Sequence, residues 1–139
     1  MTYVRLNVIV EGQTEQRFIE EILAEHLGHR QIVATARAVE TSRGNKGGLT
    51  SYQKAKNDIQ RWLKEDRNAN VHFTTMFDLY GLPTDFPGYH EALSYLPYER
   101  TEILEQKLSE DIADRRFIPY IQLHEFEALL FAAPEMLAY

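Results

Sequence analysis

The feature that most constrains the fold is a regular alternation of strand-like and helix-like segments. Four short stretches rich in β-branched and apolar residues predict strands, over residues 3–10, 32–39, 71–77 and 117–123. Segments with apolar residues at helical spacing predict helices, over residues 15–27, 51–66, 98–114 and from 125 onward. Because this order places parallel strands side by side with helices on both faces, we expect an α/β, three-layer fold with a mainly parallel sheet of about four strands.

The first strand is the most sharply defined of these elements. It ends in a continuous apolar run over residues 8–10, which is typical of a central strand covered on both faces. Gly12 allows a sharp turn after it, and Thr14 is predicted to cap the helix that Gly28 ends.

Length and composition exclude several classes of protein. The 139 residues predict a single domain over 1–139, because one core can be built at this size. The chain has no cysteine, which excludes disulfides, thiolate metal sites and a cysteine nucleophile. No apolar run reaches the length of a membrane span, and the first residues lack the pattern of a signal peptide. We therefore expect a cytoplasmic protein without a membrane partner.

The net charge of −6 argues against nucleic-acid binding through bulk charge, but the charge is unevenly distributed. Residues 37–67 hold eight basic and four acidic residues and carry +4, whereas the remainder carries −10. This segment is a candidate surface for an anionic ligand. If the ligand is nucleic acid, the expected backbone contacts are Arg43, Lys46, Lys54 and Lys56. The alternative is a polar surface loop over residues 44–48 followed by a solvated helix face.

Acidic residues stand where the predicted strands end. Glu11 follows the first strand, Asp78 the third and Glu125 the fourth, while Glu15 lies one helical turn after Glu11. Ligands of open α/β sheets bind at the carboxyl ends of the strands. Carboxylates without cysteine favour Mg²⁺ or Mn²⁺, which could orient a phosphate and activate water. The alternative is that Glu11 caps a helix, that Asp78 caps a turn, and that both are merely solvated.

Three sequence blocks carry a resemblance to known families. The block VIVEGQTE at residues 8–15 resembles the opening motif of Toprim domains, especially those of the OLD-family nucleases. The blocks TTMFDLYGLPTDFPGY at 74–89 and IPYIQLHEFEALLF at 118–131 resemble a bacterial family of unknown function, DUF4276. Together the blocks run from the first strand to the last helix, so the resemblance covers nearly the whole chain.

The resemblance implies a Toprim-like, Rossmann-like fold and a magnesium site. Toprim domains cut, join or polymerise nucleic acids, and they bind Mg²⁺ through a Glu after the first strand and an Asp-x-Asp after the third. By position, Glu11 matches the first Glu, Glu15 the second acidic residue of the nuclease branch, and Asp78 the first Asp.

The chain departs from this pattern at Tyr80, which stands where the second Asp of Asp-x-Asp is expected. Asp85, Glu125 or Glu127 could replace that ligand, or the site is a weakened or inactive one. The family also runs longer than this chain, which implies that the domain is truncated at its C-terminal end.

Two functions follow from these residues. The leading hypothesis is a Mg²⁺-dependent phosphoryl-transfer domain, a nuclease, with Glu11 and Asp78 catalytic and Glu15 and Glu125 as further metal ligands. The alternative is a non-catalytic Toprim-like module that partners an ATPase or nucleic acid, which the tyrosine at position 80 favours.

Overall fold

The computed structural model describes residues 2–39 and 49–124 of the chain. These residues form a four-stranded sheet in the order β2-β1-β3-β4, and every neighbouring pair of strands is parallel. The strands are β1 (Val4–Val10), β2 (Ile32–Ala38), β3 (Val71–Asp78) and β4 (Ile121–Gln122). The predicted α/β fold with a parallel sheet is therefore confirmed.

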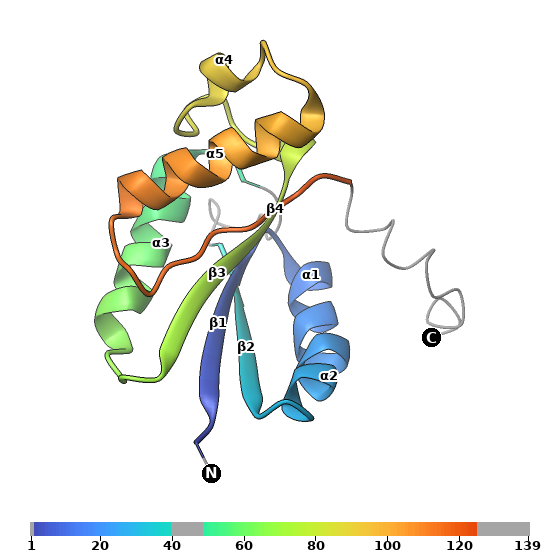
Figure 1. Cartoon of the computed structure of the whole chain (residues 1–139), viewed down its shortest axis with the longest axis vertical. Helices are drawn as coiled ribbons and strands as arrows, with labels where there is room; N and C mark the ends of the chain where they lie inside the picture. Colours follow the sequence, from blue (N-terminus) through green and yellow to red (C-terminus); the bar gives the residue numbers. More distant parts are fainter. Residues whose placement is uncertain (1, 40–48, 125–139) are drawn as a thin grey trace.

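Helices lie on both faces of this sheet (Figure 1). One face carries a continuous helical segment made of α1 (Gln13–Phe18), a π-helical turn (Ile19–Leu23) and α2 (Ala24–Gly28). The other face carries α3 (Tyr52–Glu65) and α5 (Pro97–Ile112), with the short α4 (Tyr89–Ala92) before α5. This arrangement gives the expected three layers. Within the described ranges, no helix is both long and apolar enough to cross a bilayer.

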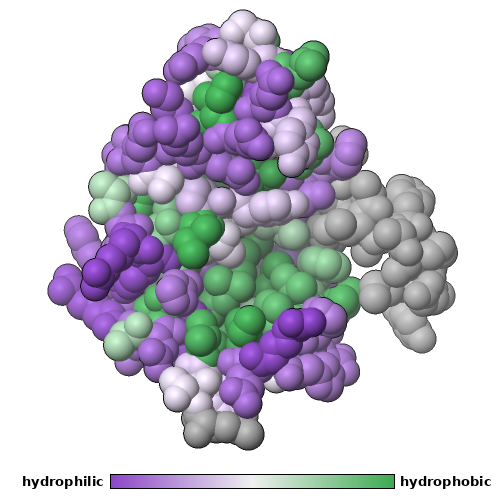
Figure 2. All heavy atoms as spheres, viewed as in Figure 1, coloured by the Kyte–Doolittle hydropathy of each residue, from purple (hydrophilic) through white to green (hydrophobic). Residues whose placement is uncertain are grey.

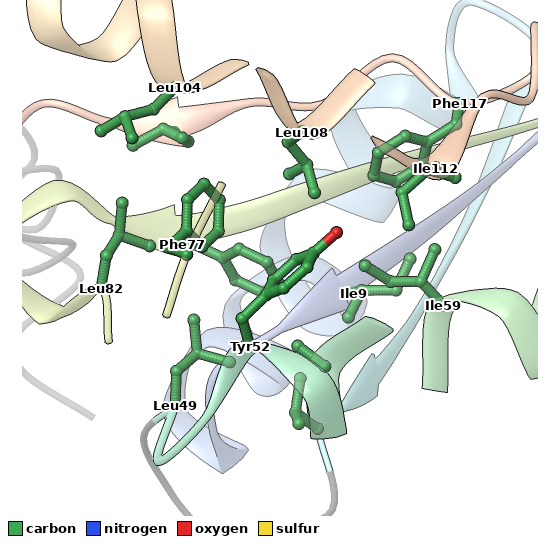
Figure 3. Close-up of a cluster of buried hydrophobic side chains, with 14 of the residues drawn as sticks. Ile9, Leu49, Tyr52, Ile59, Phe77, Leu82, Leu104, Leu108, Ile112 and Phe117 are labelled. Carbon is green, nitrogen blue, oxygen red and sulfur yellow. The ribbon is translucent and has the colours of Figure 1, made fainter. Parts of the chain in front are cut away.

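Strand β1 is buried from both faces, as its apolar run predicts. Val8 and Val10 pack with Ile19 on the α1 face, whereas Ile9 belongs to the larger core on the opposite face. In that larger core, Ile9 lies among side chains contributed by α3, α5 and β3 (Figure 3). Figure 2 shows that apolar side chains also reach the surface on the front of the sheet, beside α1.

Strand β4 is much shorter than the predicted strand over residues 117–123. Phe117 makes only an isolated bridge to Phe73, and the regular ladder is restricted to Ile121–Gln122. Pro119 has no backbone N–H to offer a ladder. At the next residue, the hydroxyl of Thr75 accepts from the N–H of Tyr120 at 3.0 Å and donates to its C=O at 2.8 Å. A buried side chain thus holds this segment against β3 where backbone pairing is interrupted.

Candidate functional site

The ends of β1 and β3 lie side by side at the carboxyl edge of the sheet. The two strands pair in parallel, with Val10 opposite Met76, so the residues that follow them emerge at the same edge. There the Oε1 atom of Glu11 accepts a hydrogen bond from the backbone N–H of Asp78 at 2.7 Å. The structure thus brings together two of the carboxyl-bearing residues singled out from the sequence.

The turn after β1 sets the position of the first helix and of Glu15. Gly12 is buried and extended (φ −156°, ψ −174°), and its C=O accepts from the N–H of Gln16, so the helix begins at Gln13. Thr14 therefore lies inside the first turn, and its prediction as the capping residue is wrong. Glu15 is half-buried in that same turn, four residues after Glu11.

The segment after β3 folds around the Glu11 carboxylate as a 3₁₀ turn over Leu79–Gly81. A Cβ atom added to Gly81 would lie 3.6 Å from Oε2 and 3.7 Å from Oε1 of Glu11. These are ordinary van der Waals distances, so the carboxylate sits directly against this turn. The Tyr80 side chain, by contrast, is 65% exposed at the middle of the turn.

Asp85, which the sequence offered as a replacement ligand, is used elsewhere. Its carboxylate accepts from the backbone N–H of Tyr52 at 2.8 and 3.0 Å and from that of Gln53 at 3.4 Å. Negative charge at a helix N-terminus offsets the partial positive charge of its unpaired N–H groups. Asp85 therefore caps α3 and ties the loop before α4 to that helix.

The remaining acidic candidates, Glu125 and Glu127, lie outside the described residues. The last described residue, His124, is exposed two residues after β4. Within residues 2–39 and 49–124, no group of three or more histidine, aspartate and glutamate side chains is arranged to hold a metal ion.

The basic residues predicted to contact nucleic acid are only partly described. Arg43 and Lys46 lie outside the described residues, whereas Lys54 is exposed on the first turn of α3. Lys56 is half-buried, and its Nζ lies 3.0 Å from Oδ2 of Asp111. Part of the predicted positive surface on α3 is thus neutralised within the protein.

The Asp111 carboxylate that pairs with Lys56 also accepts a hydrogen bond from Tyr52. The Tyr52 hydroxyl donates to Oδ2 of Asp111 at 2.5 Å. This hydrogen bond and the one from Lys56 outweigh burial and hold the pKa of Asp111 below its usual value. Burial and the neighbouring Asp111 raise the pKa of Tyr52. Tyr52 therefore stays protonated and serves to join α3 to α5.

A further cationic surface, only part of which belongs to the basic segment 37–67, lies at the opposite edge of the sheet. Arg115 and Arg116 follow α5, and they line a groove together with Lys64 and Arg67 at the end of α3. The Arg-Arg pair was the available signal in the sequence. Its proximity to α3 depends on how two distant helices pack.

The fold and the paired carboxyl-bearing residues define an α/β protein with a Rossmann-like parallel sheet and an acidic carboxyl edge. The chain matches the family model described as "Domain of unknown function (DUF4276)" over residues 10–139. The protein therefore belongs to the DUF4276 family, and the match includes Glu11 and Asp78. No curated protein and no solved structure matches the chain.

Proposed function

We propose that this protein is a Mg²⁺-dependent phosphoryl-transfer domain of the Toprim-like type, a nuclease whose metal site lies at Glu11 and Asp78. The observation that carries the proposal is the 2.7 Å hydrogen bond from the Asp78 N–H to the Glu11 carboxylate. It brings two acidic residues to adjacent ends of parallel strands, where open α/β sheets bind their ligands. The resemblance to OLD-family Toprim domains supports the same positions.

The donor set suits magnesium better than a softer metal. Glu11 and Asp78 supply hard oxygen atoms, and Mg²⁺ is commonly held by one or two carboxylates together with water and substrate phosphates. Glu15, half-buried in the first turn of α1, and Glu125 are the further ligands we propose. When bound, the ion would polarise a phosphate oxygen and lower the pKa of a water molecule.

The protein's own residues would orient this site. The Asp78 N–H fixes one oxygen of Glu11, and the 3₁₀ turn packs against the same carboxylate. A carboxylate held in this way loses less conformational entropy when it binds a cation than a fully mobile one does. The proposed substrate is a nucleic acid, whose scissile phosphate would approach at the carboxyl edge of the sheet.

A second candidate is a non-catalytic module that binds an ATPase partner or a nucleic acid. The observation that favours it is Tyr80, which occupies the position of the second aspartate and is 65% exposed. The described residues also hold no group of three metal-ligating side chains.

Cleavage assays on matched variants test the leading candidate. Labelled single-stranded and duplex oligonucleotides are incubated with the full chain and Mg²⁺, and the same reaction with a chelator gives the background. We expect Glu11→Gln and Asp78→Asn to abolish cleavage, whereas Glu25→Gln, on an exposed position of α2, leaves it unchanged. Equal cleavage by all three variants would assign the activity to a contaminant and favour the second candidate.

A further inference from the structure

A groove of about 840 Å³ opens at the amino edge of the sheet, between the ends of α3 and α5. Buried apolar side chains form its floor, including Leu63, Val71 and Ile112. Strongly hydrophilic side chains gather on the left of the space-filling view (Figure 2). This is the side on which α3 and the end of α5 lie in Figure 1.

Positive charge comes from both sides of this groove. Lys64 and Arg67 line it at the end of α3, and Arg115 and Arg116 line it after α5. The only carboxylate among the lining residues is Asp114, so the groove carries a net charge of +3. This is the opposite sign to the chain as a whole, which carries −6.

One of these cations has a structural role. Arg116 donates to both oxygens of Asp114, at 3.0–3.1 Å, and to the backbone C=O groups of Leu63 and Asp66, at 2.9 and 2.6 Å. It therefore joins the end of α3 to the segment after α5 and satisfies carbonyl groups that the helix terminus leaves unpaired. Arg116 thus neutralises Asp114 through an ion pair and holds the two sides of the groove together.

The other three cations are available to a ligand. Lys64, Arg67 and Arg115 are exposed, and none of them forms an ion pair with another described residue. Arg67 donates from Nε to the C=O of Lys64 at 3.3 Å, a contact that does not use its two terminal nitrogen atoms. Three like charges on one concave surface repel one another, and an anion relieves that repulsion.

We propose that this groove binds the phosphate backbone of a single-stranded nucleic acid. Lysine and arginine on both sides can contact successive phosphates of a strand that lies between them. The exposed guanidinium planes of Arg67 and Arg115 offer surfaces on which unpaired bases can stack, whereas a duplex keeps its bases inside. We therefore expect a single strand to bind more tightly than a duplex of the same length.

This surface is separate from the Glu11–Asp78 edge. Val71 and His72, at the start of β3, line the groove, while Asp78 ends the same eight-residue strand. At about 3.3 Å per residue, the two surfaces lie roughly 20–25 Å apart along the strand. The groove thus supplies an anchoring surface whose existence does not depend on metal binding or catalysis.

Binding in the absence of metal tests this proposal without involving the proposed chemistry. Fluorescence anisotropy is measured with a labelled single strand of about 20 nucleotides, in chelator and at about 50 mM salt. The triple variant Lys64→Glu/Arg67→Glu/Arg115→Glu is expected to weaken binding at least about tenfold. It should also reduce the slope of log K against log salt by about 2, because each phosphate contact on a single strand contributes about 0.7.

The control carries the same change of charge away from the groove. In Arg17→Glu/Arg30→Glu/Lys107→Glu the first two positions are exposed and the Lys107 side chain is 40% exposed, and we expect much weaker effects on affinity and on the salt slope. The milder pair Lys64→Gln/Arg115→Gln, which should still weaken binding, covers the case in which the triple variant fails to fold. The proposal is overturned if both triple variants weaken binding equally, if a duplex of the same length binds as tightly, or if the unmodified protein does not bind.

Discussion

Glu11 and Asp78 are joined by a hydrogen bond of 2.7 Å that crosses from the end of β1 to the end of β3. The donor is a backbone N–H and the acceptor is a carboxylate oxygen. The contact therefore needs an acceptor oxygen at this position of the side chain, and a neutral amide can supply one as well as a charged carboxylate can. Glu11 therefore has a structural role that is independent of any metal. Variants at this position must distinguish the two roles.

Substitutions at Glu11 separate its hydrogen bond from its charge. Glu11→Gln keeps a carbonyl oxygen at the same distance from the backbone, so the bond to the Asp78 N–H is expected to persist. Glu11→Ala removes the acceptor and should lower the free energy of unfolding by about 1–3 kcal/mol. Urea denaturation measures the free energy of unfolding of both variants. Equal destabilisation by the two variants would show that the hydrogen bond contributes little.

Tyr80→Asp restores the second aspartate that the Toprim-like pattern expects. Because the Tyr80 side chain is 65% exposed, the substitution should leave folding intact. An additional carboxylate beside Asp78 should raise the affinity for Mn²⁺ about tenfold, since ligand charge tunes the affinity of such sites. Tyr98→Asp, at a position that is 68% exposed on α5, is the matched control. Isothermal titration calorimetry that showed the same gain for both variants would argue against a site at this turn.

Asp66 is predicted to make stability depend on pH in the acid range. Burial alone would raise the pKa of Asp66, but hydrogen bonds from Asn7 and Asn68, with the charge of Arg5, hold it below the ordinary value of 3.8. Because the pKa is lowered in the folded state, the stabilisation is complete above 3.8 and is lost as the pH falls through the folded value.

The variant Asp66→Asn tests this dependence. It should lower the free energy of unfolding by about 1.5–3 kcal/mol at neutral pH, since it removes a buried charged acceptor. Its difference from the unmodified protein should shrink in strong acid, where Asp66 is protonated in both states of the unmodified chain. Urea denaturation at neutral and strongly acidic pH measures this difference. A gap that stays constant with pH would contradict the role given to the carboxylate.

Thr75 is predicted to hold the segment before β4 in place. Thr75 is 1% exposed, and its hydroxyl forms hydrogen bonds with both the N–H and the C=O of Tyr120. Thr75→Val has nearly the same shape and should cost about 2 kcal/mol, because it leaves both backbone groups without this partner. Hydrogen exchange at Tyr120 and Ile121 should accelerate. Thr35→Val, at an exposed position of β2, should change neither quantity.

The sequence predicts the fold best where burial determines the order of apolar and polar residues. The apolar run of β1 predicts a central strand because both faces of that strand are covered. Its last residue then places Glu11 at the carboxyl edge. That Asp78 lies next to Glu11 requires β1 and β3 to be neighbours, which the order of elements allows but does not dictate.

Tertiary contacts explain the parts that the sequence did not predict. The pattern of residues 117–123 does not reveal that Thr75 replaces a backbone partner at Tyr120. A count of basic residues over 37–67 includes Lys56, whose charge is paired with Asp111 on another helix. The same count omits Arg115, which lines one groove with Arg67 because the segment after α5 lies against the end of α3.

The central claim is that Glu11 and Asp78 hold a divalent cation. It is tested most directly by titrating Mn²⁺ into the ¹⁵N-labelled full chain and recording which backbone amide signals broaden. We predict selective broadening at Gly12, Asp78 and Gly81, lost in Glu11→Gln and Asp78→Asn and retained in Glu25→Gln. Unchanged signals at these residues at millimolar Mn²⁺, or broadening that persists in both site variants, would contradict the claim.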